Sequence, residues 1–178
     1  NYQKSFTCMT PNAELALPAT NAVAQRAADD GRLRTYRLAL ASTGEYSQYF
    51  LNGTETTDAQ RKAKVLAAMN TLLTRTNGIY ERDFGIRMVL IANNDAIIYL
   101  TASTDPWTTE WNTKTQTTID AVIGSANYDI GHLVHKGSNN GNAGCIGCIC
   151  KAGQKGSAFT SHTAPVGDPF VVDYTTHE

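Results

Sequence analysis

The last two residues of the sequence, His177 and Glu178, are of the types that bind a metal ion and move a proton. Imidazole nitrogen is a common zinc ligand, and a carboxylate beside the metal can accept a proton from a bound water molecule. In the H-E-x-x-H pattern, two histidines on one helical face hold zinc and the glutamate between them polarises the water. Most His-Glu pairs have no such role, so the elements around the pair decide what it indicates.

A short helix is predicted immediately before this pair. Asp168 suits the N-cap, and Pro169 suits the first helical position because the N–H that it lacks would have no partner there. Phe170, Tyr174 and His177 then follow at spacings of four and three residues and share one helical face. No cap or helix breaker follows them. We therefore expect the sequence to end inside a metal-binding helix, after its first half.

Four cysteines are the other reactive side chains: Cys8, Cys145, Cys148 and Cys150. They allow three pairings if all are oxidised, and we expect one bridge within residues 145–150 that includes Cys145. The alternative is a structural zinc cluster of all four thiolates, although Cys8 is remote and the last spacing is tighter than C-x2-C.

The three remaining histidines are not expected to bind zinc. His132 and His135 lie three residues apart in a predicted strand, which places their side chains on opposite faces. His162 lies in a polar stretch that is predicted to be a loop.

The elements that must position these residues begin at Leu33. Apolar runs predict a half-buried strand at 35–41, a largely buried strand at 86–91, its short hairpin partner at 96–100, and further strands at 128–134 and 157–160. A capping box at Thr57 and Gln60 opens a long amphipathic helix that ends near Gly85. Residues 115–123 predict a second helix.

The bulk composition sets wider limits. A chain of 178 residues suits one domain with a buried core, and a formal net charge of −1 favours no nucleic acid and no membrane surface as a partner. No apolar run approaches the roughly 20 residues that span a bilayer. Residues 1–32 show no sustained period, and we expect them to be a leader, a remnant of a pro-region or a linker.

Five stretches that lead up to the His-Glu pair occur in a specific order. They are Tyr36-Arg37-Leu38-Ala39-Leu40, the run from Met69 to Asp83, Ile86-Arg87-Met88-Val89-Leu90, the run from Ile119 to His132, and the run from Gly167 to Tyr174. In this order and spacing the sequence resembles the metzincin zinc peptidases, most closely the reprolysin-like (adamalysin-like) peptidases and their bacterial secreted relatives. The resemblance covers residues 33–178.

The resemblance implies an α+β fold with α/β character. Residues 33–178 would form the upper, amino-terminal subdomain of a catalytic domain. It would consist of a twisted, mixed five-stranded sheet with an antiparallel edge strand, two backing helices and the start of the active-site helix. The lower subdomain is expected in a carboxy-terminal part that the sequence does not include.

The resemblance also assigns roles to the terminal pair. His177 matches the first zinc ligand and Glu178 the general base of the motif H-E-x-x-H-x-x-G-x-x-H. The other histidines, the glycine and the methionine turn of the family have no counterparts here. We therefore expect a secreted, extracellular or periplasmic zinc endopeptidase that cleaves peptides or proteins. Zinc would be held only in the complete protein, and the 178-residue chain alone would be inactive.

Two further expectations come from the family. Substrate adds to an antiparallel edge strand, whose place corresponds to residues 142–147 with Gly144, Cys145 and Ile146; a Gly-rich loop without a ligand is the alternative. Some metzincins are kept latent by a pro-region cysteine that binds the zinc. Cys8 is a candidate for that role, and a structural disulfide or a free thiol are its alternatives.

Two other classes of function remain open. A non-catalytic peptide-binding module could keep the fold without the metal site, and it should show a properly capped terminal helix. An unrelated secreted αβ domain would lack a long helix packed across a sheet whose edge strand precedes the terminal helix.

Overall fold

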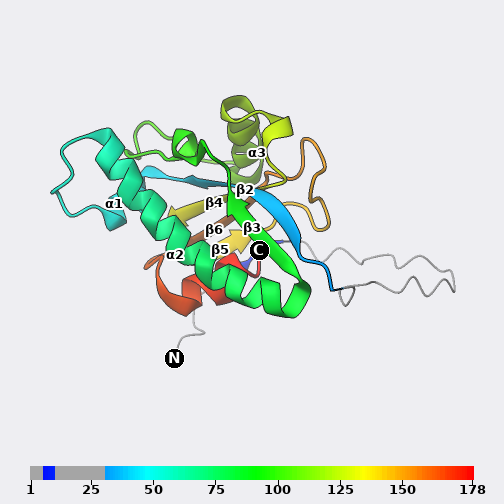
Figure 1. The fold of residues 1–178 in the computed structure, drawn as a ribbon. Helices are drawn as coiled ribbons and strands as arrows, with labels where there is room; N and C mark the ends of the chain where they lie inside the picture. Colours follow the sequence, from blue (N-terminus) through cyan, green and yellow to red (C-terminus); the bar gives the residue numbers. More distant parts are fainter. Residues whose placement is uncertain (1–5, 11–30) are drawn as a thin grey trace, which may run out of the picture.

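The computed structural model describes residues 6–10 and 31–178, and its centre is a twisted sheet of six strands (Figure 1). The strand order is β1-β5-β6-β4-β2-β3. Every neighbouring pair is parallel except β5 and β6, which are antiparallel. The strands are β1 (Thr7–Cys8), β2 (Arg34–Ser42), β3 (Ile86–Leu90), β4 (Ile130–Lys136), β5 (Asn140–Asn142) and β6 (Ala158–His162). The mixed α/β architecture is therefore confirmed, with β1 as a strand beyond the five predicted.

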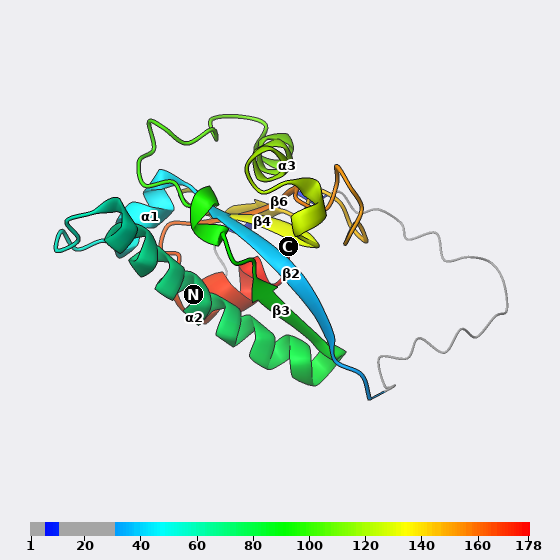
Figure 2. The same cartoon turned by 45° about the horizontal axis from the view of Figure 1, so that its top comes forward.

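Helices cover both faces of this sheet (Figure 2). The long α2 (Asp58–Phe84) and the terminal helix η3 (Pro169–Thr175) lie against one face, and α3 (Trp111–Val122) lies against the other. The central strand β2 alternates between the two sides, as an extended chain must. Leu38 and Leu40 pack with α2, whereas Ala39 and Ala41 pack with α3. The core is thus two apolar layers separated by the sheet.

The capping box and the apolar stripe predicted for α2 are both present. The Thr57 side chain accepts from the Gln60 N–H at 3.3 Å, and Gln60 Oε1 accepts from the Thr57 N–H at 3.2 Å. The helix ends at Gly85, whose φ of 61° is the left-handed conformation that glycine adopts without strain. Val65, Met69, Leu72 and Leu73 are buried against the sheet. The helix therefore lies in one fixed position beneath β2 and β3.

Two expectations for the region around β3 are wrong. Residues 86–91 are not largely buried, because β3 is an edge strand and Val89 is exposed. Residues 96–100 do not form a hairpin strand; a 3₁₀ helix, η1 (Asn94–Ile97), lies there instead. The cause is Asn94, whose buried amide accepts from the Leu40 N–H at 2.8 Å and donates to the Leu40 carbonyl at 2.9 Å. A side chain thus pairs with β2 where another strand would otherwise do so.

The helices differ from the prediction in two places. β2 ends at Ser42, and Thr43 is the N-cap of α1 (Gly44–Phe50), a helix that the sequence does not predict; the Thr43 hydroxyl accepts from the Tyr46 N–H. The helix predicted at 115–123 begins four residues earlier, at Trp111. Its first turn gives little local signal because Asn112 and Thr113 are weak helix formers.

The segment 1–32 is described only at residues 6–10 and 31–32. Its strand β1 pairs with β5 in parallel register, Thr7 opposite Asn140 and Cys8 opposite Gly141. The interpretation of residues 1–32 as a leader, pro-region remnant or linker remains a prediction, and most of it falls on residues outside the described ranges.

Candidate metal centre

The terminal helix is held beside the sheet by α2. Phe170 is fully buried, and Tyr174 is 7% exposed. The Tyr80 hydroxyl donates to the Thr176 carbonyl at 2.9 Å, and the Arg75 guanidinium makes two hydrogen bonds to Asp168 at 2.8 and 3.0 Å. These contacts fix both ends of the helix on one scaffold element.

The start of this helix differs from the expectation. Pro169 is the first helical residue, as predicted, but Asp168 does not cap it. Its carboxylate faces Arg75 instead, which lowers the pKa of Asp168 through the hydrogen bonds to the guanidinium. The turns are of the wide π type, with the Thr176 N–H donating to the Val171 carbonyl at 3.0 Å. One further turn brings His177 and Glu178 to the edge of the sheet.

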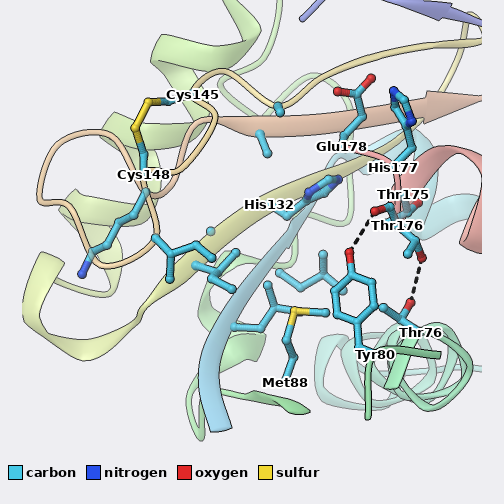
Figure 3. Close-up of a pocket in the computed structure, with 18 of the residues that line it drawn as sticks. Thr76, Tyr80, Met88, His132, Cys145, Cys148, Thr175, Thr176, His177 and Glu178 are labelled. Carbon is cyan, nitrogen blue, oxygen red and sulfur yellow. Dashed lines mark hydrogen bonds between the residues drawn. A yellow bond between two sulfur atoms is a disulfide. The ribbon is translucent and has the colours of Figure 1, made fainter. Parts of the chain in front are cut away.

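Three potential metal-ligating side chains meet at this edge. Cys8, His177 and Glu178 each place a potential ligand atom within 4.8 Å of those of the other two. No other such group of His, Cys, Asp or Glu side chains occurs in residues 6–10 and 31–178. His177 Nε2 lies 3.4 Å from Cys8 Sγ. Figure 3 shows the imidazole and the carboxylate side by side above β6. Cys8 and His177 are exposed, and Glu178 is half-buried.

The donor set suits zinc. A thiolate, an imidazole and a carboxylate are the three protein ligand types that zinc binds. Glu178 also shows a local deficit: Oε2 accepts from the Thr10 hydroxyl at 2.8 Å, whereas Oε1 is buried and has no hydrogen-bond partner. A buried carboxylate oxygen without a donor is costly, so its position favours a cation or a water molecule at this point.

The Cys8 segment reaches the site as an added strand. The Thr7 N–H donates to the Asn139 carbonyl at 3.0 Å, and the Met9 N–H donates to the Gly141 carbonyl at 2.8 Å. Beyond the strand, the Ala143 N–H donates to the Thr10 hydroxyl at 2.6 Å. These bonds occupy the hydrogen-bonding groups of β5 that would otherwise face solvent.

Alternate residues of this segment contact the terminal helix and the pair that follows it. Phe6 stacks on Tyr174, Cys8 lies beside His177, and Thr10 donates to Glu178. The period of two is that of an extended strand with one face on the helix. In the sequence, only Cys8 had been singled out. The alternation Phe6-x-Cys8-x-Thr10 was the available signal, but it is too short to be specific.

Gly141 is a further residue of the site that the sequence does not reveal. A Cβ atom at this position would lie 2.7 Å from both Cγ and Oε1 of Glu178. The carboxylate therefore rests directly on the backbone of β5, and only glycine leaves it that room. No local pattern identifies this requirement, since the two residues are far apart in the sequence.

The expected edge strand is displaced from residues 142–147. β5 ends at Asn142, and Gly144 then has a φ of 71°, which turns the chain away from the sheet. Cys145 and Ile146 lie in a loop closed by the Cys145–Cys148 disulfide. Gly144, Cys145 and Ile146 therefore do not pair as an edge strand, because the left-handed glycine ends the extended conformation.

This loop forms one side of a cavity of about 320 Å³ beside the candidate metal centre. Its floor is apolar and includes Leu38 and Met88 from the sheet and Leu72 from α2. Cys145 and Cys148 lie on one side, and His177 and Glu178 on the other (Figure 3). The pair thus stands at the margin of an apolar hollow.

The cysteines confirm one expectation and contradict another. The disulfide Cys145–Cys148 is the predicted bridge within residues 145–150. The four-thiolate zinc cluster is wrong, because two of its sulfur atoms are bonded to each other and Cys8 lies at His177. Cys8 and Cys150 are free and exposed.

The other three histidines lie outside the cluster. His132 Nε2 lies 2.8 Å from the Thr160 hydroxyl, and burial lowers the pKa of His132 to about 4. His135 lies on the opposite face of β4, beside Trp111 and Thr43, as predicted. His162 is not in a loop: it ends β6, and its ring centroid is 5.1 Å from that of Tyr174.

The fold is a mostly parallel sheet between two helix layers, with the His177-Glu178 pair beside the edge of the sheet. The family model described as reprolysin-like metallo-peptidases of family M12B matches residues 32–178, and the chain belongs to that family. A search among curated proteins gave no match. The resemblance seen in the sequence is confirmed, and the alternative of an unrelated αβ domain is wrong.

Family membership establishes the general activity. The protein is a metalloprotease of a zinc-dependent family, and its substrates are peptides or proteins. None of the helices in the described part of the chain has the length and apolar character needed to cross a bilayer.

Proposed function

We propose that the protein is a zinc endopeptidase in which His177 is the first metal ligand and Glu178 the general base. The observation that carries the proposal is the meeting of the two side chains in one donor cluster, at the margin of an apolar cavity and beside a sheet edge. Bound zinc would polarise a water molecule and the substrate carbonyl. The side chains of the protein would bind and orient the substrate, and Glu178 would accept the proton.

Glu178 is suited to accept that proton. Its carboxylate rests on Gly141, and in the latent chain the Thr10 hydroxyl donates to Oε2 while Oε1 has no partner. Gly141 thus positions the carboxylate, and release of the Thr10 segment would leave its oxygens to accept a hydrogen bond from water, as a general base requires.

We further infer that a carboxy-terminal part of the protein completes the metal site. The family motif places two more histidines after the His-Glu pair, and zinc in a catalytic site takes three protein ligands and water. The 178-residue chain supplies one of those histidines, so it should be inactive alone. The apolar cavity beside the pair offers a surface against which the rest of the active-site helix can pack.

Substrate is expected to add to β5, of which only Asn142 belongs to the stretch 142–147 predicted from the sequence. The groups that hold β1 are the carbonyls of Asn139 and Gly141, and a peptide can use the same groups as an added strand. Gly144, Cys145 and Ile146 would then line the end of the substrate path instead of pairing with the substrate.

Cys8 is proposed as a latency residue. Its thiol lies at the metal cluster, and its strand covers the edge that a substrate would use. A thiolate there would take the position of the catalytic water. This arrangement suits a zymogen, with residues 1–32 as part of a pro-region. The disulfide within 145–150 agrees with a secreted, extracellular or periplasmic enzyme, since such bonds persist in oxidising compartments.

The proposal is tested on the complete protein by measuring zinc content and casein cleavage. Glu178→Gln should retain zinc and lose cleavage, and His177→Ala should lose both. Full cleavage by Glu178→Gln removes Glu178 from the mechanism. Binding of peptides without cleavage by the wild type, with no zinc retained, would instead support the peptide-binding module.

A further inference from the structure

An aromatic side chain already occupies a position next to the candidate metal centre. The rings of Phe6 and Tyr174 are stacked, with centroids 3.9 Å apart and planes inclined by 15°. Phe6 also meets the His177 ring edge-on, with centroids 6.3 Å apart. Aromatic pairs of this kind add to the effect of burial alone. Phe6 is therefore a specific contact of the added strand, besides its main-chain hydrogen bonds.

The surface that receives Phe6 is held in place without it. Tyr174 is 7% exposed and belongs to a helix fixed by Tyr80 and Arg75 of α2. Behind it, the His162 ring lies 5.1 Å from Tyr174, and His162 Nδ1 lies 2.7 Å from the Ala164 carbonyl. A binding surface that is fixed in advance loses little entropy when it is occupied.

The distance between the Phe6-binding surface at Tyr174 and the metal centre follows from strand geometry. Phe6 and Cys8 are two residues apart on one face, so their side chains are separated by about 7 Å along the strand. Cys8 marks the metal centre, because its Sγ lies 3.4 Å from His177 Nε2. Tyr174 therefore receives the side chain two residues away from the one at the metal.

We propose that Tyr174, backed by His162, is an aromatic-binding subsite that selects peptide substrates with Phe, Tyr or Trp two residues from the residue at the metal. The proposal rests on the proposed function, and Phe6 fills the subsite in the latent chain. The subsite is a fixed place on the protein. It therefore serves the N-terminal side of a peptide that runs parallel to β5, as β1 does, and the C-terminal side of an antiparallel one.

The first test needs no catalytic activity, because the Met9 amide reports whether the segment is bound: its N–H donates to the Gly141 carbonyl at 2.8 Å. Hydrogen exchange of this amide is timed in the 178-residue chain, with the Ile91 amide, which donates to the Leu38 carbonyl, as the reference in the same molecule. Phe6→Ala should raise the exchange rate of the Met9 amide relative to the Ile91 amide about threefold to tenfold, the amount expected for an aromatic pair. Phe6→Tyr should leave this ratio unchanged.

The partner residue gives the matched variant. Tyr174→Leu keeps an apolar side chain but removes the ring, and it should raise the exchange rate of the Met9 amide as much as Phe6→Ala does. The double variant should show no further increase. If the Met9 amide of Phe6→Ala exchanges at the wild-type rate, the subsite is wrong, and this result does not depend on whether Tyr174→Leu folds.

The second test uses the complete, activated protein and two pairs of peptides. Within each pair the peptides differ only by Phe or Ala, two residues before the residue at the metal in one pair and two residues after it in the other. In one of the pairs, wild type should cleave the Phe peptide with a kcat/KM about threefold to tenfold higher, and Tyr174→Leu should reduce that ratio to about one. Equal rates within both pairs for the wild type overturn the subsite and leave the peptidase intact. Cleavage of no peptide, with exchange of the Met9 amide as predicted, overturns the proposed function and leaves an aromatic-binding site.

Discussion

Glu178 depends on a glycine that lies far from it in the sequence. Its carboxylate rests on the backbone of Gly141, and one of its oxygens is held by Thr10. A methyl group at position 141 would displace the carboxylate and would leave the β5 backbone in an ordinary extended conformation. The substitution would thus change the position of the Glu178 carboxylate without changing its chemical nature.

Gly141→Ala should therefore impair catalysis more than folding. We expect kcat/KM of the complete protein to fall about 100-fold, since misplacement of a catalytic group by about 1 Å has effects of that size. The melting temperature should change by only a few degrees. Gly78→Ala is the matched control, because no atom lies within 4 Å of its added Cβ. Equal activity of the two variants would contradict this role of Gly141.

His132 predicts how stability varies with pH. Burial lowers its pKa to about 4, below the usual value of 6.5, so the unfolded chain binds more protons between these values. The contribution of His132 to the free energy of unfolding should thus be fully present above pH 6.5. It should be lost as the pH falls toward 4, by roughly 3 kcal/mol at most. Burial lowers the pKa of His135 as well, with the same sign.

Urea unfolding of the 178-residue chain at pH 7 and pH 4.5 measures this loss. His132→Gln cannot titrate and keeps a group able to bond Thr160, so its stability should decrease less between the two pH values. A decrease equal to that of the wild type would show that other groups dominate the acid sensitivity.

At the scale of elements, α2 is the scaffold on which the terminal helix rests. Gly78 is an exposed interior residue of this helix, and replacement by Ala relieves the entropy cost that glycine imposes on a helix. We expect Gly78→Ala to stabilise the chain by about 0.5–1 kcal/mol. Denaturant unfolding measures this gain, and a loss of stability in Gly78→Ala would contradict the open space at that position.

Thr57→Ala removes the N-cap of the same helix. It should lower the free energy of unfolding by about 1 kcal/mol in the same measurement.

Local signals located α2 and β2 well, because a capping box, a left-handed glycine and an alternating strand act within a few residues. The failures have distant causes. Residues 96–100 are not a strand because Asn94 pairs with Leu40, 54 positions earlier. Asp168 does not cap its helix because Arg75 attracts it. In the site, His177 and Glu178 came from a motif, whereas Thr10 and Gly141 meet Glu178 only in the folded chain.

At the scale of the whole molecule, residues 6–10 and the pair His177-Glu178 meet at one edge of the sheet. Cys8 and His177 are 169 positions apart, and no sequence pattern could place them together. The added strand and the thiol restrain the same edge independently. Removal of either restraint alone should release only part of the activity.

In the complete, unprocessed protein, Cys8→Ser should therefore raise basal peptidase activity about tenfold, which corresponds to roughly 1.4 kcal/mol of lost segment binding. Deletion of residues 1–10 should raise it further, because it also removes β1 from the edge. Cleavage of a quenched peptide measures both. Cys150→Ser is the control for loss of a free thiol. An unprocessed Cys8→Ser variant as inactive as the wild type would argue against latency through this residue.

The brevity of β5 has a consequence for what this strand can recognise once β1 has left it. Three residues offer too few main-chain groups to recruit a second sheet, and short edges of this kind protect proteins from aggregation. For the same reason, main-chain hydrogen bonds to β5 can contribute only a small part of the affinity for a bound peptide. Selectivity among peptides must then come from the side chains around β5, so a strand too short for self-association also makes recognition depend on side chains.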